Sequence, residues 1–464
     1  MRKKIISGLI VSILLTGCDN ILEIDDPTDS LSAEQAFSSP EGIRAAATGL
    51  YTKNFLDNGM IYQVVDLYYS LLSDDLRARN NNLSQYFKST YNPSTPYFLD
   101  FWQYPYKGIY QSNDFISRLE GSTLIPEKER NQYLGEALWF RAYYYLLLTN
   151  SYGDVPLVLT NNASESAVLP RAPKAEVDAQ IVKDLEQAVA YLQGSENAKT
   201  RITPDAAIAL LARAYLYQEQ WQKALNTANR LIPSSDGGQG GDKYKLESIE
   251  RVFRANSKEQ ILQDNMEGFV GTGTYAGYTR QAYLFIPYSS IVYYYLSDEL
   301  VQDLQSEPSD LRNTWVGKSE NGSQVFYYPY KYKNNTTPAN SDDYEYLSLL
   351  RLAELYLIRA EANAHLGHVG ESVNDINIIR GRAGLEPIST DISQSDLYLR
   401  IETERRKEFF TELGHRWFDL RRTNRLDEVL GTNSYKQWEP HRKLFPVPEK
   451  ELNKNANLTQ NPGY

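Results

Sequence analysis

The segment Pro204–Tyr217 (PDAAIALLARAYLY), followed closely by Trp221–Asn229 (WQKALNTAN), decides the fold of this chain. In both segments small and apolar residues recur at the spacing of a helix face. Thr203 precedes the first segment as a favourable N-cap, and Pro204 suits the first position of a helix. Pro233 follows the second segment and cannot continue a helix. The sequence therefore predicts two consecutive helices between residues 204 and 232.

Two other segments, 136–153 and 354–380, look related, and both contain the motif Glu-x4-Arg-Ala. In the segment 204–232, the pattern Leu211-Ala212, Tyr215 and Ala224 resembles the spacing of a tetratricopeptide (TPR) repeat, in which small residues let paired helices approach closely. Ala142 and Ala212 lie 70 positions apart (212 − 142), close to twice the 34-residue period of that repeat. A further helical stretch, 177–192, lies between them. We therefore expect repeat-like helix pairs, with unrelated amphipathic helices as the alternative.

The composition excludes several classes of protein. The chain has 464 residues, of which 42% are hydrophobic, so it can bury a large core. Its net charge of 48 − 59 = −11 argues against nucleic acid as a partner, because phosphate binding needs a basic surface. One Cys and four His exclude a disulfide framework and a clustered Cys/His metal site. Tyrosine is unusually abundant, with 36 Tyr against 15 Phe.

The N-terminus reads as a bacterial lipoprotein signal peptide, residues 1–17. Three basic residues precede the apolar run 5–15, which is too short to span a bilayer because spanning takes about 20 apolar residues. The run ends in Leu-Thr-Gly-Cys18, which matches the lipobox pattern and contains the sole cysteine. We expect cleavage before Cys18 and acylation of its thiol, with an ordinary secretory signal as the alternative. Residues 18–35 then form an acidic tether, and the mature charge of 45 − 59 = −14 leaves the lipid as the only membrane attachment.

Four stretches, in this order along the chain, resemble the SusD/RagB family of outer-membrane lipoproteins of the Bacteroidetes. They are Trp102-x3-Tyr106-x2-Ile109-x3-Asn113, the stretch 136–157 with its Tyr-Gly-Asp-Val-Pro-Leu end, the stretch 401–420 (IETERRKEFFTELGHRWFDL), and the terminal Phe445-Pro-Val-Pro448 with 458–464. Together with the lipobox, the resemblance covers nearly the whole mature chain.

The resemblance implies a cell-surface lipoprotein that caps a TonB-dependent, SusC-like transporter in the outer membrane and delivers an oligosaccharide to it. A RagB-like protein would instead deliver peptides. The implied fold is all-α, with TPR-like helix pairs packed against a loop-rich half that carries the ligand site. We expect a single SusD-like domain over 36–464 with loop-rich insertions at about 76–101, 234–346 and 431–464. The helical half is expected to face the transporter.

Catalysis is not predicted. Glu404, Glu408 and Glu412 are spaced along one expected helix face, but arginines surround them and hold such carboxylates ionised, which does not suit an acid catalyst. We therefore expect a salt-bridged helix followed by a buried Trp417-Phe418. The same reasoning pairs Glu402 with Arg406, Arg141 with Glu136, and Arg359 with Glu354. A lipid-anchored glycosidase stays as a remote alternative.

No metal or other cofactor is predicted. His365 and His368 lack a third nearby His or Cys, as zinc would require. Oxygen-rich loops such as 234–242 and 341–343 could hold a calcium ion, but nothing in their spacing requires one.

Aromatic residues concentrate in three windows, 86–110, 275–295 and 326–346, which we expect to be loops or short strands, although Trp102 is expected on a structural helix. Tyr and Trp offer rigid, amphipathic contact area on which a sugar ring can pack. The predicted ligand-binding aromatic residues are Tyr86, Tyr278, Tyr283, Trp315 and Tyr328. The predicted partners for ligand hydroxyl groups are Asp74, Asp75, Arg77 and Arg79.

Overall fold

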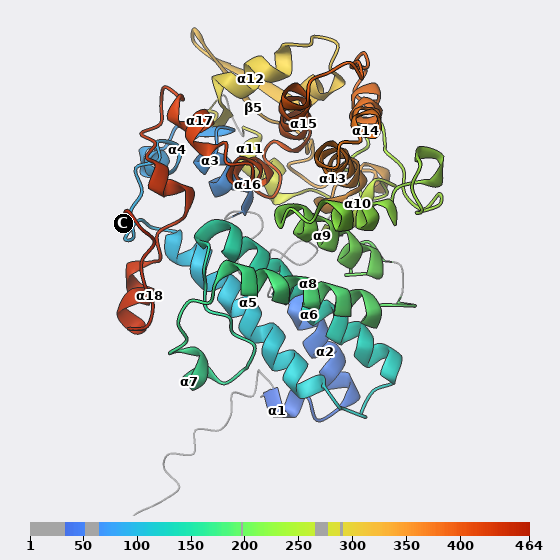
Figure 1. Cartoon of the computed structure of the whole chain (residues 1–464), viewed down its shortest axis with the longest axis vertical. Coiled ribbons are helices and arrows are strands. Elements are labelled where there is room, and N and C mark those ends of the chain that lie inside the picture. The colour runs from blue at the N-terminus through green and yellow to red at the C-terminus, as the bar shows by residue number, and fades with distance from the viewer. Residues whose placement is uncertain (1–32, 52–64, 196–197, 265–276, 288–290) are drawn as a thin grey trace, which may run out of the picture.

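The computed structural model describes residues 33–51, 65–195, 198–264, 277–287 and 291–464 (Figure 1). The predicted signal peptide, Cys18 and most of the predicted tether lie outside the described residues. Among the aromatic residues of the window 275–295, Tyr275 and Tyr288 lie outside them as well.

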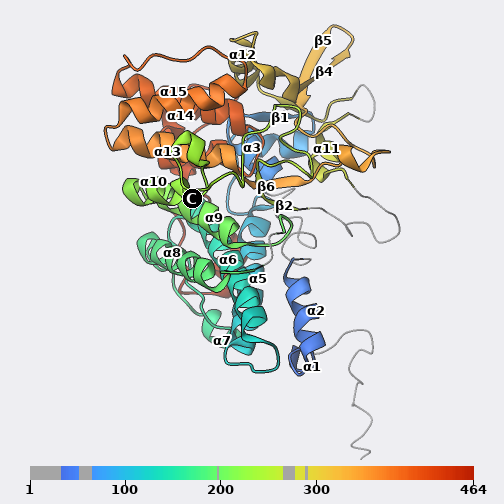
Figure 2. The ribbon, with the colours of Figure 1, turned by 90° about the vertical axis from the view of Figure 1, so that its right-hand side faces the viewer.

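Paired helices form most of the structure, as the sequence predicted, and Figure 2 shows them stacked along one side of the molecule. The long helices are α5 (Phe98–Leu119), α6 (Glu127–Tyr152), α8 (Lys174–Tyr191), α9 (Pro204–Tyr217), α10 (Trp221–Asn229), α13 (Leu352–His365), α14 (Val369–Arg382) and α15 (Gln394–Phe409). The shorter ones are α1 (Ala33–Ala36), α2 (Pro40–Tyr51), α3 (Tyr69–Leu72), α4 (Ser84–Phe87), α7 (Ala163–Ser166), α11 (Arg280–Phe285), α12 (Asp298–Gln305), α16 (His415–Arg422), α17 (Leu426–Gly431) and α18 (Glu449–Lys454).

The strands of the described residues form three small antiparallel pairs. β1 (Leu76–Ala78) pairs with β3 (Tyr294–Leu296), β2 (Gln260–Asp264) with β6 (Leu347–Arg351), and β4 (Val316–Asn321) with β5 (Gln324–Pro329). In Figure 2 these strands and α11 lie on the side opposite the stacked helices. The strand-bearing side is the loop-rich half that the sequence predicted.

Small residues let the central helices pack closely. Thr203 caps α9 as predicted, since its hydroxyl accepts a hydrogen bond from the backbone N–H of Ala206 at 3.2 Å. Every residue of α9 from Ala206 onward is buried. Gly108 of α5 meets the ring of Tyr144 of α6 so closely that a Cβ would lie 2.1 Å from it. The aromatic window 86–110 is therefore not wholly irregular, because its second half from Phe98 is the start of α5 and carries the buried Trp102.

The Glu-x4-Arg-Ala motifs join neighbouring helices, and the predicted pairing within each motif is wrong. Arg141 binds Asp184 of α8 at 2.6 Å, and Arg359 binds Asp375 of α14 at 2.6 Å. Five positions correspond to a rotation of about 140° at 3.6 residues per turn, so the two charges of a motif point in different directions. The glutamates also reach outward: Glu136 binds Arg201 at 2.7 Å, and Glu354 of α13 binds Arg213 of α9 at 2.6 Å.

Replacing Arg213 with Met should lower the free energy of unfolding by about 3 kcal/mol or more, because it leaves the buried carboxylate of Glu354 unpaired. Urea denaturation of the purified protein measures the loss. Lys318→Met, which breaks the exposed pair between Lys318 and Glu320, is the control and should leave the urea midpoint unchanged. An Arg213 variant as stable as this control would show that the buried pair does not join α9 to α13.

Candidate functional site

The carboxylates of Glu404, Glu408 and Glu412, on and just after α15, form ion pairs with buried arginines. Arg351 lies within 3.0 Å of oxygens from Glu259, Glu408 and Glu412, and all four side chains are buried. Burial opposes ionisation of Glu408, but the guanidinium groups of Arg382, Arg351 and Arg312 outweigh it and hold the pKa of that carboxyl well below its usual range. Glu412 lies beyond the end of α15 at Phe409 rather than on its face. The block is a buried salt-bridge network that includes Glu404, which binds Arg312 at 3.1 Å.

The predicted ion pair between Arg406 and Glu402 does not form. Arg406 binds Asp74 at 2.8 Å, whereas Glu402 binds Arg416 and Arg425, each at 3.0 Å. Trp417 and Phe418 are buried in the core, as predicted.

Asp74 and Asp75 are not available to a ligand, so their assignment as hydroxyl partners is wrong. Both are at most 3% exposed, because they precede β1 with their side chains turned toward α15 and α16. Asp74 receives two hydrogen bonds from Arg416, at 2.7 and 2.9 Å. Burial raises the pKa of Asp74, but Arg406 and Arg416 overcome this and lower it below its ordinary value. Sequence context marked these aspartates as loop residues without indicating which way they point.

Arg77 and Arg79 differ from each other. Arg77 is half-buried, pairs with Asp298 at 3.1 Å and stacks over the ring of Tyr435 at 3.8 Å, so its guanidinium is largely occupied. Arg79 is exposed at the end of β1, where its backbone N–H donates to the carbonyl of Tyr293 at 2.8 Å. Of the four predicted polar partners, Arg79 is the one whose exposure suits the role.

Two of the five predicted aromatic residues belong to the core, and the prediction is wrong for them. Trp315 is 1% exposed and donates from its indole N–H to the carbonyl of Ile249 at 3.1 Å. Tyr86 is fully buried against Tyr68 and Phe98, and its hydroxyl donates to the carbonyl of Pro96. Both side chains are packed in the core, although the composition of the surrounding sequence had indicated exposed loop residues.

The other three aromatic residues lie nearer the surface. Tyr278 is half-buried just before α11. Tyr328 is half-buried on β5, where its ring covers Gly317 of the paired strand. Tyr283 of α11 is 72% exposed. Tyr283 therefore has the accessibility that its predicted role requires.

Tyr283 lies on one of three neighbouring segments that carry exposed tyrosines. We call the tyrosines of these segments the tyrosine face: Tyr97, Tyr283, Tyr293, Tyr294 and Tyr295. Tyr293 is 61% exposed and Tyr97 is 38% exposed. The ring of Tyr294 lies 6.2 Å from that of Phe285 in α11. Burial raises the pKa of Tyr294, and the neighbouring phenol of Tyr97 raises it further. Tyr295 packs edge-on against Phe326 of β5 at 5.3 Å. These contacts place α11, β3 and the segment before α5 beside one another.

Tyr97 is held in a strained conformation. Its φ of 68° places it in the left-handed region, which a tyrosine rarely adopts, at the N-cap position of α5. Its ring lies 4.6 Å from that of the buried Tyr68. Such strain persists only where the surroundings over-determine the backbone, and it is concentrated at ligand-binding sites. Sequence reasoning missed Tyr97, although its place directly after Pro96 in an aromatic loop was an available signal.

Polar groups border the tyrosine face. Arg79 and the asparagines Asn80, Asn81 and Asn82 are exposed and follow β1, whose partner strand carries Tyr294 and Tyr295. Asp100, in the first turn of α5, is half-buried, and burial raises its pKa. The region thus combines exposed aromatic rings with guanidinium, amide and carboxyl groups, the set that binds a polyhydroxylated ligand.

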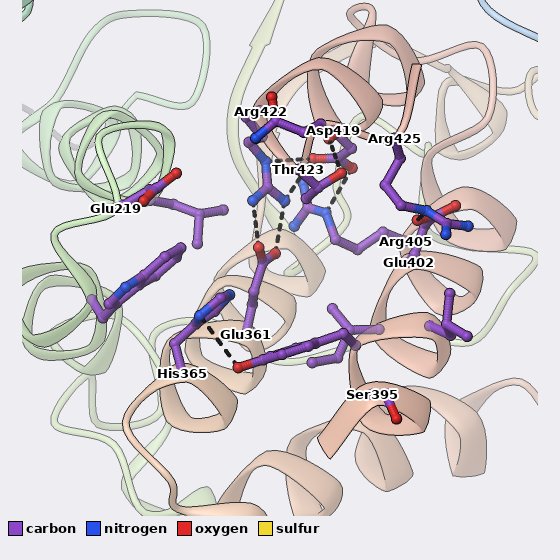
Figure 3. Close-up of a pocket in the computed structure, with 16 residues that line it drawn as sticks. Glu219, Glu361, His365, Ser395, Glu402, Arg405, Asp419, Arg422, Thr423 and Arg425 are labelled. Carbon is purple, nitrogen blue, oxygen red and sulfur yellow. Dashed lines mark hydrogen bonds and ion pairs between the residues drawn. The ribbon is translucent and has the colours of Figure 1, made fainter. Parts of the chain in front are cut away.

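Figure 3 shows a different hollow, a cavity of about 520 Å³ where the turn before α10 meets α13, α15 and α16. Its buried carboxylates are bonded to guanidinium groups, Glu361 to Arg422 and Asp419 to Arg405 at 2.7 Å. On one wall Trp221 stacks on His365 at 3.8 Å, and burial lowers the pKa of that histidine. None of the residues predicted to bind ligand lines this cavity.

Two further features bear on metal and membrane binding. In the described part of the chain, no group of three or more His, Cys, Asp or Glu side chains is placed to hold a metal ion. None of the described helices combines the length and the apolar character needed to cross a bilayer.

Comparison with known proteins gives the family. A family model described as "SusD family" matches residues 272–464, and one described as "Starch-binding associating with outer membrane" matches residues 22–216. The chain belongs to the SusD/RagB family. SusD-like protein P38 of Formosa agariphila is 26% identical, over 97% of this chain and 96% of its own length. The starch-binding protein SusD of Bacteroides thetaiotaomicron is 33% identical over 129 residues, which are 25% of this chain and 21% of SusD.

Solved structures establish the SusD fold for this chain. A SusD superfamily protein from Bacteroides vulgatus superposes with a TM-score of 0.77 at 24% identity, covering 92% of this chain and all of that one. A laminarin-binding SusD-like protein superposes with a TM-score of 0.71 at 24% identity and the same coverage. The all-α architecture with a strand-bearing, loop-rich half is therefore the family fold, as the sequence predicted.

The ion pairs around α15 should make stability fall in acid. Hydrogen bonds from Arg380, with Lys407 as a second partner, lower the pKa of Glu307 to about 2. A depressed carboxyl pKa contributes stability above its unfolded value, about 4.3, and that contribution is lost as the pH falls toward 2. We expect Glu307→Gln to destabilise the protein at pH 7 and to flatten the pH dependence of the urea midpoint below about pH 4.5. Glu250→Gln, at an exposed residue, should leave that dependence as steep as in the wild type, and an equally steep curve for Glu307→Gln would contradict the assignment.

Proposed function

We propose that this SusD-family protein is a non-catalytic binding protein of the cell surface that captures an oligosaccharide and passes it to a partner TonB-dependent, SusC-like transporter in the outer membrane. The observation that carries the proposal is the tyrosine face, where Tyr97, Tyr283 and Tyr293 are exposed on three neighbouring segments and polar side chains lie close by.

The chemistry of the tyrosine face suits a glycan. A sugar ring presents an apolar C–H face that packs on an aromatic ring, and its hydroxyl groups need donors and acceptors at the border. Tyrosine supplies large contact area at low cost in side-chain entropy. Arg79, Asn80, Asn81 and Asn82 supply donors and acceptors beside Tyr293.

The relatives support the same class of ligand. One family model carries a starch-binding description, a structural neighbour binds laminarin, and another is a surface glycan-binding protein from Bacteroides fluxus. The outer-membrane association in the family description supports the proposed location. The SusC-like partner rests on the family resemblance.

The absence of catalysis in this proposal rests on the state of the carboxylates. A glycosidase needs one carboxyl group that can donate a proton to the leaving oxygen. Glu408 is buried among guanidinium groups, which hold its pKa well below its usual range. Glu404 is buried as well and is paired with Arg312 at 3.1 Å. We also propose that binding requires no metal or other cofactor.

Replacing Tyr283 or Tyr293 with Ala should weaken binding about tenfold, because each removes an exposed ring of the kind that carries more than 1 kcal/mol at a binding surface. Isothermal titration against soluble starch, laminarin and a wider panel of polysaccharides measures the affinity. Tyr110→Ala is the matched control, since Tyr110 is 46% exposed but lies in a groove between α5, α1 and α7.

Three outcomes would contradict the proposal. Equal affinity in both tyrosine variants removes the tyrosine face from the site. Cleavage of the polysaccharide by the purified protein favours the glycosidase alternative. Binding of basic peptides that weakens steeply with salt favours a RagB-like function, since the mature charge of 45 − 59 = −14 attracts cations whereas a neutral glycan is indifferent to salt.

Cys18→Ala should release the protein from the membrane fraction, because acyl chains on Cys18 are the proposed attachment. Fractionation of cells expressing wild type and variant, followed by immunoblotting, measures the distribution. Membrane retention of the variant equal to wild type would refute the lipid anchor.

A further inference from the structure

The carboxylate of Asp66 connects two segments that are far apart in sequence. Asp66 is 1% exposed. Its Oδ2 accepts a hydrogen bond from the side-chain amide of Gln281, and its Oδ1 accepts one from the backbone N–H of Leu413 at 2.6 Å. The first partner belongs to α11 and the second to the turn between α15 and α16.

The segment on the Gln281 side carries Tyr283. α11 has six residues, and a helix this short is not stable by itself. Thr279 caps it, with its hydroxyl accepting from the N–H of Ala282 at 3.1 Å. Gln281 is 2% exposed, whereas Tyr283, two positions later, is 72% exposed. The amide of Gln281 is therefore a buried polar anchor for the helix that presents Tyr283 to solvent.

The segment on the Leu413 side is rigid. Thr411 and Leu413 have φ values of 55° and 43°, in the left-handed region that neither residue favours. Such a strained conformation persists only where its surroundings fix it. The neighbouring Glu412 is bound by the buried Arg351 at 2.9 Å. Asp66 thus ties α11 to a turn that is itself fixed by the ion-pair network.

We propose that Asp66 and Gln281 are positioning residues for ligand binding, which hold α11 so that Tyr283 is pre-arranged on the tyrosine face. This inference rests on the proposed function. Ordering a binding segment in advance removes an entropic cost from the binding step. Loss of the tether should free α11, and affinity should fall without a change in any group that contacts the ligand.

The structure also indicates which substitution at Asp66 preserves the tether. The side-chain oxygen of Gln281 is buried without a hydrogen-bond partner. In Asp66→Asn the new amide oxygen still accepts from Leu413, and the new NH₂ group donates to that oxygen once the Gln281 amide turns over. Asp66→Ala has neither capacity.

The first test needs no ligand. Hydrogen exchange of the α11 amides is measured in the wild type and in Gln281→Ala, Asp66→Ala and Asp66→Asn. We expect exchange about tenfold faster or more in the two Ala variants and unchanged in Asp66→Asn. Gln260→Ala is the matched control, because Gln260 is also fully buried and its amide donates to a backbone carbonyl, that of Val252 at 2.7 Å, but it lies on β2. Unchanged exchange in Gln281→Ala overturns the tether, and equal acceleration in Gln260→Ala shows general loosening and overturns it as well.

The second test measures affinity for starch and laminarin in Gln281→Ala, Tyr283→Ala and the double variant. If the tether acts through Tyr283, both single variants lose the same factor, about tenfold, and the double variant loses no more. Additive losses, or wild-type affinity in Gln281→Ala despite faster exchange, overturn the positioning role. If Tyr283→Ala binds normally while Tyr293→Ala does not, the positioning role fails and the proposed function stands. If neither tyrosine variant loses affinity, both fail.

Discussion

The buried guanidinium of Arg351 binds three carboxylates from two separate parts of the chain. Its partners are Glu259 before β2, Glu408 of α15 and Glu412 of the following turn, and Arg351 itself ends β6 and immediately precedes α13. Removing one member of such a cluster leaves a buried charge unpaired, at a cost of several kcal/mol. The strand-bearing half and the helical pairs are therefore held in a single arrangement. Asp74 connects distant segments in the same way. Its ion pairs with Arg406 and Arg416 attach the segment before β1 to α15 and α16.

The helical architecture was predictable because helix periodicity and caps are local properties. The pattern of 204–232 and the Thr203 cap were read directly from neighbouring residues, and the structure confirms them. The ion-pair partners were not predictable in this way. Arg141 and Arg359 were assigned to glutamates of their own helices, whereas their partners lie on the next helix of the pair. Which side of a helix meets a neighbour is a tertiary property, and periodicity does not contain it.

The candidate site was predictable in kind but only partly in its residues. Loop composition selected Tyr283 and Arg79, which are exposed, and equally selected Trp315, Tyr86, Asp74 and Asp75, which are buried. Tyrosine abundance has two sources that the sequence does not separate. Many tyrosines are buried in the core, where their hydroxyl group donates a hydrogen bond to a backbone carbonyl. Tyr145 donates to Val158 at 2.8 Å, and Tyr91 donates to Arg442 at 2.8 Å. Only the remainder, such as Tyr97 and Tyr293, reach solvent.

The two uses of tyrosine depend on each other. Each contact with a glycan contributes little binding free energy, so the surface must lose little conformational entropy when the glycan binds. Tyr97 meets this condition because its strained backbone is fixed by the rings beneath it, Tyr68 and the fully buried Tyr86. The ion-pair network around α15 likewise binds Glu408 to guanidinium groups, which hold its pKa well below its usual range. Under the proposed function such an arrangement suits ligand binding, because the buried rings and ion pairs hold the exposed rings in place before the ligand arrives.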